Sequence, residues 1–315
     1  MQKLKSLLPN IPSHNQTPSP PPFHVSAIPG KGLGLLASRH LHRGDPIMSQ
    51  TPVLLVHRAF LESPAPSDHH FSQRLLDSAV DALPDPTRSL FLSQLGHFGG
   101  RHRVTDILAT NSFQTDIGGD EGGGHHYANY PEVSRFNHDC RPNVAFRVDR
   151  GLVHWTAAVR DVVAGEELGI TYLDSFEPRA ARRERALHAW GFECGCEQCR
   201  LTGEEGRESD ARLKEIRRIE GLLGDWQTAG VTKEIVAKYV ELFREERLEF
   251  SVAGAYTLAA LNCNMLGEEV MAVEYARLAV EAGRVENGPE AGDVREMEAL
   301  RRDPRGHFSW RKRVQ

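Results

Sequence analysis

The sequence lacks a long hydrophobic run and an excess of positive charge. No apolar stretch approaches the roughly 20 residues that a membrane-spanning helix needs, so we expect a soluble protein without a membrane partner. Its 38 lysine and arginine residues stand against 43 acidic residues, for a formal net charge of −5. Without a basic excess there is little attraction to phosphate groups, and direct nucleic-acid binding is not expected. A chain of 315 residues with 40% hydrophobic content allows one large or two moderate domains.

Acidic residues are absent from the first 44 positions. Organellar transit peptides are also poor in acids, but they are rich in arginine, whereas this segment has only Lys3 and Lys5 and no arginine before residue 30. Because residues 1–22 are rich in proline, serine and asparagine, we interpret them as a disordered leader, with a targeting segment as the alternative. We expect the protein in the nucleus or the cytoplasm, neither secreted nor in a membrane.

Cysteine is scarce, and three of the five cysteines lie together. An odd, clustered set in a large chain favours metal binding over a framework of disulfides. Cys194, Cys196 and Cys199 offer three thiolates within six residues, whereas structural zinc is held by four ligands in a tetrahedron. The fourth ligand is therefore missing locally. Cys263 lies among apolar residues of helical type and is interpreted as a plain core thiol.

The densest group of polar side chains lies between Asn137 and Asn143. It contains the pair Asn137-His138, then Cys140, and Pro142 stiffens the backbone ahead of an alternating apolar run. Asparagine and histidine side chains both donate and accept hydrogen bonds. Such a group can bind a polar ligand through hydrogen bonds and at the same time fix neighbouring backbone groups.

This stretch resembles the Asn-His-Ser-Cys-x-Pro-Asn signature of SET-domain protein lysine methyltransferases, with Asp139 in place of the serine. Residues 165–172, Gly-Glu-Glu-Leu-Gly-Ile-Thr-Tyr, resemble the second signature of that family, and residues 190–199 resemble its post-SET cysteine segment. The motifs follow one another in the family's order. The chain is most similar to the SET-and-MYND branch, but residues 57–100 contain no cysteine, which excludes a MYND zinc module.

The resemblance implies an α+β fold. A β-rich SET domain of small sheets with a pseudoknot would occupy residues 23–175, split by a helical insertion at 57–103. A zinc-binding post-SET segment would follow at 176–204, and an α-helical C-terminal domain at 205–315. Apolar residues at helical spacing support that last assignment.

Smaller features complete the predicted architecture. A further helix is expected at 104–113, and a glycine-rich loop at 117–126. Residues 260–283 resemble one tetratricopeptide-type (TPR-like) helix pair, for which a packing role and peptide binding are both open.

The resemblance also implies a site for S-adenosyl-L-methionine. Lys31, Gly32 and Leu33 would approach it through their backbone, in a segment between predicted strands at 24–28 and 35–37 that by itself reads as a plain hairpin. The side chains assigned to the cofactor are those of Asn111, Asn137, His138, Tyr172, Trp190 and Phe192. Asn111 also fits a simple helix terminator, and Phe192 alone would read as a core aromatic.

Tyr172 is the predicted catalytic residue, because the family's tyrosine at this place lies beside the transferring methyl group. Tyr130 and Trp190 are candidate walls of a lysine channel, since aromatic faces can embrace an alkylammonium group. Cys140 would be the fourth zinc ligand. The implied function is methyl transfer to the ε-amine of a protein or peptide lysine, histone or non-histone. The alternative is a catalytically weak, SET-derived interaction module with a structural zinc site.

Overall fold

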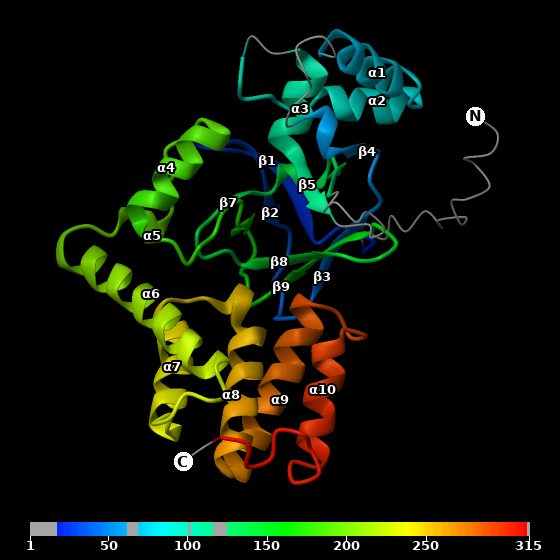
Figure 1. Ribbon diagram of the computed structural model, residues 1–315. Coiled ribbons are helices and arrows are strands. Elements are labelled where there is room, and N and C mark those ends of the chain that lie inside the picture. The colour runs from blue at the N-terminus through cyan, green and yellow to red at the C-terminus, as the bar shows by residue number, and fades with distance from the viewer. Residues whose placement is uncertain (1–17, 62–68, 100–101, 116–124, 314–315) are drawn as a thin grey trace.

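The structure is a computed structural model that describes residues 18–61, 69–99, 102–115 and 125–313. A β-rich body occupies the middle of Figure 1, with a helical cap above it and a helical bundle below it. Most of the predicted leader at 1–22, and most of the predicted loop at 117–126, lies outside the described residues.

The strands of the described residues form three small sheets. The first contains, in spatial order, β1 (Phe23–Ile28), β2 (Gly32–Ala37), β10 (Glu167–Ile170) and β7 (Asn137–His138). The second contains β3 (Pro46–Gln50), β9 (His154–Ala158) and β8 (Val144–Val148). The third contains β4 (Leu54–His57), β6 (His126–Asn129) and β5 (Ser112–Thr115). These small sheets confirm the β-rich part of the predicted fold, whereas the pseudoknot stays a prediction.

The first hairpin differs from its prediction in one respect. Gly32 already pairs with Ile28, so the strand predicted at 35–37 begins three residues earlier and the glycine-rich turn is shorter than expected. Gly30 sits in this turn with φ of +75°, a conformation that glycine adopts without the steric cost of a side chain.

Strand β10 joins the two predicted signatures. It pairs antiparallel with β2 and parallel with β7, which sets Gly169 opposite Asn137 and Ile170 opposite His138. Asn143, just beyond β7, fastens the same strand: its Oδ1 accepts from the Gly169 amide at 2.9 Å, and its Nδ2 donates to the Glu167 carbonyl at 2.8 Å. The two signatures are therefore one structural unit.

The helical cap includes the predicted insertion. Its elements are η1 (Arg58–Phe60), α1 (His69–Asp81), α2 (Asp85–Leu92) and α3 (Arg103–Asn111). They share an apolar core that includes Leu76, Phe91 and Ile107. The carboxylate of Asp106 accepts from the backbone amides of His97 at 3.0 Å and Phe98 at 2.9 Å, which fixes the loop ahead of α3. Helix α3 ends two residues before the predicted boundary, because β5 begins there.

Two helices flank the loop that carries Cys194 and Cys196. They are α4 (Arg179–Trp190) and the short α5 (Glu197–Arg200). Gly191 ends α4 with φ of +72°, the left-handed conformation that commonly closes a helix. This sharp stop sends the chain back toward the body of the protein.

The C-terminal bundle is helical, as predicted. It contains η3 (Glu249–Ser251), α6 (Gly203–Gly224), α7 (Lys233–Glu245), α8 (Val252–Leu266), α9 (Glu269–Glu286) and α10 (Gly292–Arg302). Leu213, Ile216 and Ile219 of α6 are buried, and burial of each such side chain contributes about 1.5–3 kcal/mol. The buried alanines Ala259 and Ala276 lie in α8 and α9, which pack against each other. A tetratricopeptide identity for this pair stays a prediction. Among the described helices, none is long and apolar enough to span a bilayer.

Candidate functional site

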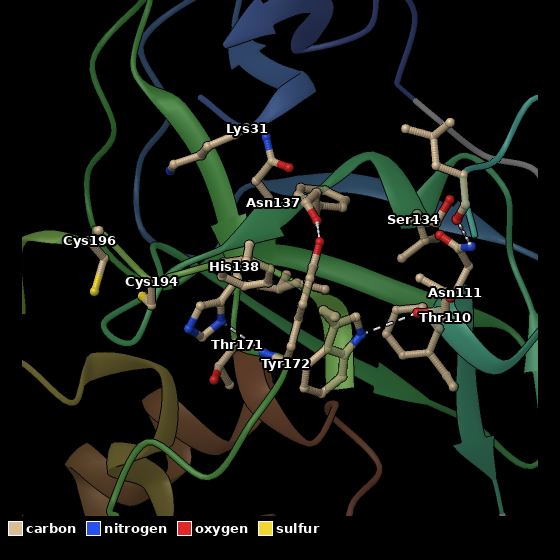
Figure 2. Close-up of a pocket in the computed structure, with 18 of the residues that line it drawn as sticks. Lys31, Thr110, Asn111, Ser134, Asn137, His138, Thr171, Tyr172, Cys194 and Cys196 are labelled. Atoms are coloured by element: carbon tan, nitrogen blue, oxygen red, sulfur yellow. Dashed lines mark hydrogen bonds between the residues drawn. The ribbon is translucent and has the colours of Figure 1, made fainter. Parts of the chain in front are cut away.

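A cavity of about 750 Å³ opens beside β7 and β10, with α3 and the cysteine segment forming other parts of its wall. The 3₁₀ helix η2 (Val133–Arg135) contributes to the same lining. In Figure 2, Tyr172 stands near the centre, with Asn137 and His138 on one side and Thr110 and Asn111 on the other. Segments far apart in the sequence thus converge on one cavity.

Charged and polar groups fix the side of the cavity next to β2. The Nζ of Lys31 lies 2.7 Å from Oε2 of Glu167, and Nδ2 of Asn137 donates to Oε1 of the same carboxylate at 2.9 Å. Glu167 thereby fixes the side chain of Lys31, in the turn between β1 and β2, and that of Asn137, on β7. Both held side chains line the cavity, which gives it a polar edge.

His138 links the cavity to the cysteines. Its Nδ1 accepts from the backbone amide of Tyr172 at 3.1 Å, and its Nε2 lies 3.3 Å from Sγ of Cys140. Burial lowers the pKa of His138 to about 4, so the ring is neutral at physiological pH. Since Nδ1 is an acceptor, the single proton of the neutral ring belongs on Nε2, facing the sulfur.

The hydroxyl of Tyr172 is fixed and neutral. It donates to the backbone carbonyl of Phe136 (Figure 2). Burial is the main cause that raises the pKa of Tyr172, and the nearby Glu167 carboxylate adds to it, so the phenol keeps its proton. A phenol in this state can orient a ligand but does not act as a base.

Aromatic rings complete the wall around Tyr172. The ring centroid of Trp190 lies 5.4 Å from that of Tyr172, and its Nε1 donates to the Thr110 carbonyl at 3.2 Å. Phe192 lies 5.8 Å from the His138 ring and 6.4 Å from Tyr172, edge-on to the latter. Trp190 therefore holds the end of α4 against α3 and presents an aromatic face to the cavity.

Most of the predicted cofactor residues meet at this cavity. Those that line it are Lys31, Asn111, Asn137, His138, Tyr172, Trp190 and Phe192. Gly32 and Leu33 are not among the lining residues, and the side chain of Leu33 is largely exposed on β2. The carbonyl of Leu33 nevertheless lies 3.4 Å from Nδ2 of Asn137, so β2 helps to position a residue that lines the cavity.

Two further candidates have structural partners. The Nδ2 of Asn111 donates to the carbonyls of Leu95 at 2.8 Å and Ile107 at 2.9 Å, which leaves its Oδ1 for a ligand. Tyr130 is completely buried, donates to the Leu152 carbonyl at 2.8 Å, and is not a lining residue. The interpretation of Tyr130 as a channel wall is therefore wrong, because its ring fills the core.

The four cysteines of the predicted metal site lie together and are buried. Their sulfur atoms are all within 4.8 Å of one another, with 3.5 Å between Cys140 and Cys199 and 3.9 Å between Cys140 and Cys194. Four sulfurs at about 2.3 Å from a tetrahedral zinc ion are about 3.8 Å apart, so this donor set fits zinc. Cys194 and Cys196 also line the cavity, so metal site and cavity share a wall. Cys263 is buried in the helical bundle instead.

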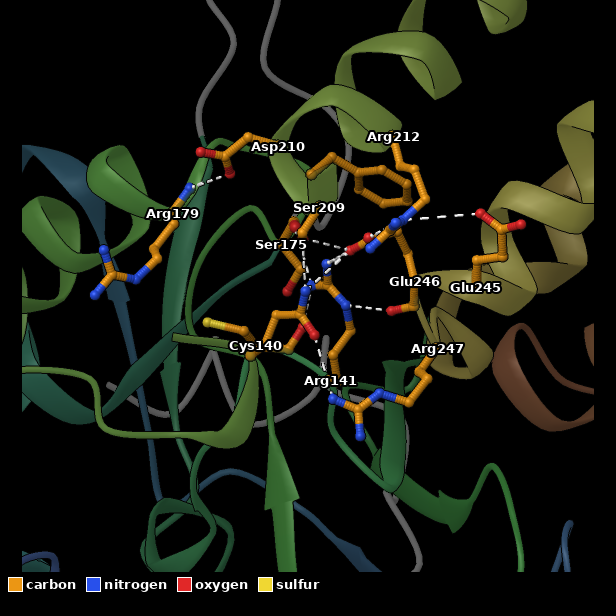
Figure 3. Close-up of polar contacts among 12 residues, drawn as sticks. Cys140, Arg141, Ser175, Arg179, Ser209, Asp210, Arg212, Glu245, Glu246 and Arg247 are labelled. Carbon is orange, nitrogen blue, oxygen red and sulfur yellow. Dashed lines mark hydrogen bonds and ion pairs between the residues drawn. The ribbon is translucent and has the colours of Figure 1, made fainter. Parts of the chain in front are cut away.

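A buried ion pair behind the cysteines was not predicted. Arg141 lies between Cys140 and Pro142, and its Nη2 is 2.7 Å from Oε2 of Glu246 at the end of α7 (Figure 3). Glu246 is also bonded by Arg212 of α6, at 2.7 Å. Arg141 additionally donates to the Cys140 carbonyl at 2.8 Å. Because Glu246 follows Arg141 by 105 positions, no local pattern pointed to this pair.

Parts of this chain are similar in sequence to known proteins. Residues 32–173 match the family model described as SET domain. The histone-lysine N-methyltransferase set5 of Schizosaccharomyces pombe is 29% identical over 201 residues, which cover 62% of this chain and 56% of that protein. The histone-lysine N-methyltransferase SMYD3 of Mus musculus is 30% identical over 169 residues, which cover 50% of this chain and 38% of that protein.

These matches are partial. The chain spans 56% of the length of set5 and 38% of that of SMYD3. A crystal structure of the SET domain of LSMT bound to lysine and AdoHcy aligns over 91% of this chain and 89% of that chain, at 14% identity. Its TM-score of 0.32 is too low for a comparison of the two folds.

Proposed function

We propose that this chain is a SET-domain protein related to the SMYD lysine methyltransferases, and that it transfers methyl groups from S-adenosylmethionine to the ε-amine of lysine in a protein substrate. The observation that carries the proposal is the convergence of Tyr172, His138 and Asn137 on one cavity with aromatic walls. Relatives named as histone-lysine methyltransferases make histones the first substrates to test. We further propose a nuclear or cytoplasmic location.

The lining residues fit the proposed cofactor. When bound, S-adenosylmethionine supplies a methyl group that its sulfonium has already activated. Lys31 and Asn137, both held by Glu167, offer an ammonium and an amide group to the polar amino-acid end of the cofactor. The face of Phe192 suits a purine ring, as stacked aromatic pairs do elsewhere. The chain's task is then to bind, orient and exclude water.

Tyr172 would orient the reacting groups without exchanging a proton. Its hydroxyl is committed as a donor to the Phe136 carbonyl, so its oxygen presents lone pairs to the cavity. Among the described lining residues, Glu193 is the single carboxylate, and it pairs with Arg183 at 3.2 Å and is mostly exposed. With no carboxylate free to act as base, the substrate amine would lose its proton because desolvation by the aromatic wall disfavours the charged form.

We propose that the four clustered thiols hold a structural zinc ion. As thiolates, Cys194, Cys196 and Cys199 would bind the metal together with Cys140 from the first signature. Such a site would clamp the cysteine segment to the body of the protein. It would thereby hold Phe192 and Trp190, which precede the cysteines, against the cavity.

The test is transfer of labelled methyl from S-adenosylmethionine to histones and whole-cell protein. We expect Tyr172→Phe to keep cofactor binding and to lower the transfer rate by about 100-fold or more, as loss of one preorganised polar group does in other enzymes. Tyr256→Phe, on α8 and not among the residues that line the cavity, is the matched control. Equal labelling by Tyr172→Phe would remove that tyrosine from the mechanism. Absence of both labelling and cofactor binding in zinc-loaded protein would favour the interaction module instead.

A further inference from the structure

A smaller cavity adjoins the one described. It has a volume of about 250 Å³ and shares two lining residues with the larger cavity, Phe146 of β8 and Thr171. Thr171 directly precedes Tyr172, so the two cavities are neighbours at the predicted reaction centre. The other walls belong to β8 and to the ends of the C-terminal helices, namely Val144, Ala145, Phe250, Ser251, Glu286 and Asn287. Figure 1 shows α8 and α9 reaching β8 and β9 at this boundary.

The lining of the small cavity has the chemistry of a cation site. Glu286 is the one ionisable side chain among its described lining residues, and Phe146 and Phe250 add two aromatic rings. Ser251 and Asn287 add polar groups at its edge. A carboxylate beside aromatic rings suits a guanidinium or ammonium group. Such a group can form hydrogen bonds to the carboxylate and lie over the face of a ring.

The carboxylate of Glu286 is held in place. Its two oxygens accept from the backbone amide of Ala253, at 3.1 and 3.3 Å, in the first turn of α8. Each carboxylate oxygen can accept more than one hydrogen bond, so capacity is left for a ligand. Burial raises the pKa of Glu286 to about 7, and a cation entering the cavity would favour its ionised form.

The protein's own nearby cations do not fill this cavity. The guanidinium of Arg147 lies 5.0 Å from the centre of the Trp155 ring, and Arg147 is not a lining residue. The charge of Arg43 lowers the pKa of Glu286, but Arg43 likewise does not line the cavity. Within the part of the chain that the structure describes, the lining offers Glu286 no basic side chain.

We infer that this cavity binds a basic side chain of the substrate, so that the protein selects target lysines with an arginine or a second lysine nearby. The inference rests on the proposed function. Because Thr171 forms part of both walls, and an extended peptide advances about 3.3–3.6 Å per residue, the selected side chain should be about one to three residues from the target lysine. Glu286 is then a specificity-determining residue contributed by the C-terminal helices.

The experiment compares peptides with one central lysine and either arginine or its uncharged isostere citrulline at each of the three positions on both sides. We measure kcat and KM for methyl transfer. Binding is measured separately, by fluorescence anisotropy in the presence of S-adenosylhomocysteine. We expect a preference of about tenfold for arginine at one position, mainly in KM, as for a hydrogen bond to a charged group. Glu286→Gln, which keeps an acceptor for the Ala253 amide, should reduce this preference for arginine to less than twofold.

The matched control is Glu281→Gln, which changes an exposed carboxylate on the same helix that pairs with Arg277. It should keep the full preference. Methyl transfer without an arginine preference at any position would overturn the inference and leave the proposed function standing. A binding preference that depends on Glu286, without methyl transfer, would uphold the subsite and count against the enzyme. Absence of binding and transfer with every peptide would overturn both.

Discussion

Single side chains at the cavity serve both a ligand and the fold. The Tyr172 hydroxyl donates a hydrogen bond to the Phe136 carbonyl, and the Tyr172 backbone amide donates one to Nδ1 of His138. His138 in turn faces the sulfur of Cys140. A change at one of these residues is therefore expected to disturb both the orientation of the rings and the cysteine cluster, which is why conservative substitutions such as tyrosine to phenylalanine are the informative ones.

We predict that Glu286 makes the stability of the fold depend on pH. Burial raises its pKa from 4.5 to about 7; Arg43 opposes this rise and Asp293 adds to it. Between these two pH values the folded protein holds a proton that the unfolded chain has lost, so the free energy of unfolding falls as pH rises from about 4.5 through 7. The loss is about 3 kcal/mol, because a pKa difference of one between the folded and unfolded states corresponds to about 1.4 kcal/mol.

Urea unfolding of the wild type and Glu286→Gln at pH 5 and pH 8 measures this effect. The glutamine variant cannot ionise, so it should lose less stability than the wild type between the two pH values. Glu281→Gln, whose carboxylate is exposed, should behave as the wild type does. Parallel losses in all three proteins would mean that Glu286 titrates normally.

Among the secondary-structure elements, β10 and α7 do most to assemble the site. β10 brings the two signatures side by side through its parallel pairing with β7. The end of α7 supplies Glu246, which is completely buried and bonded by Arg141, Arg212 and Ser209. Thus a helix of the C-terminal bundle supports the loop that carries Cys140.

Breaking the buried pair should be costly. Glu246→Leu leaves Arg141 buried without its counter-charge, and we expect a loss of about 3–5 kcal/mol of unfolding free energy. The double variant Arg141→Met with Glu246→Leu removes both charges and should lose much less than the sum of the single variants. Chemical denaturation of Glu246→Leu, Arg141→Met and the double variant checks this. Additive losses would show that the pair does not act as a unit.

At the scale of the whole molecule, the cysteine cluster joins the β-rich body to the segment that leads into the helical bundle. Its members come from the loop after β7 and from the chain around α5. Cys194 and Cys196 also line the cavity. Metal binding is therefore expected to support the fold and the site together.

Removal of zinc by a chelator should lower the Tm by about 10 °C or more. Metal binding contributes several kcal/mol to folding, and each kcal/mol lost lowers the Tm by about 2–4 °C. Removal of zinc should also weaken binding of S-adenosylhomocysteine. Metal analysis should give one zinc per chain for the wild type and Cys263→Ser, and less for Cys196→Ser. Unchanged Tm and ligand binding after complete removal of zinc would contradict a structural role.

The resemblance of three ordered motifs to the SET family implied the fold class, and local patterns in the sequence indicated the helical bundle and the approximate positions of most elements. Apolar spacing along α6 and α7 follows the helical repeat, and turn residues such as Gly30 mark where a strand must end. The three clustered cysteines also indicated a metal with one ligand missing. These features depend on neighbours within a few residues, which the sequence displays directly.

The tertiary structure alone decided which distant segments meet. It buried Tyr130 in the core, paired Arg141 with Glu246, and set Glu286 at the wall of a cavity next to Thr171. Composition and spacing carry no signal for such contacts, because they depend on how whole sheets and helices pack. The sequence by itself determined the chemical groups available to the site, and packing of the two halves of the molecule determined which of them share a cavity.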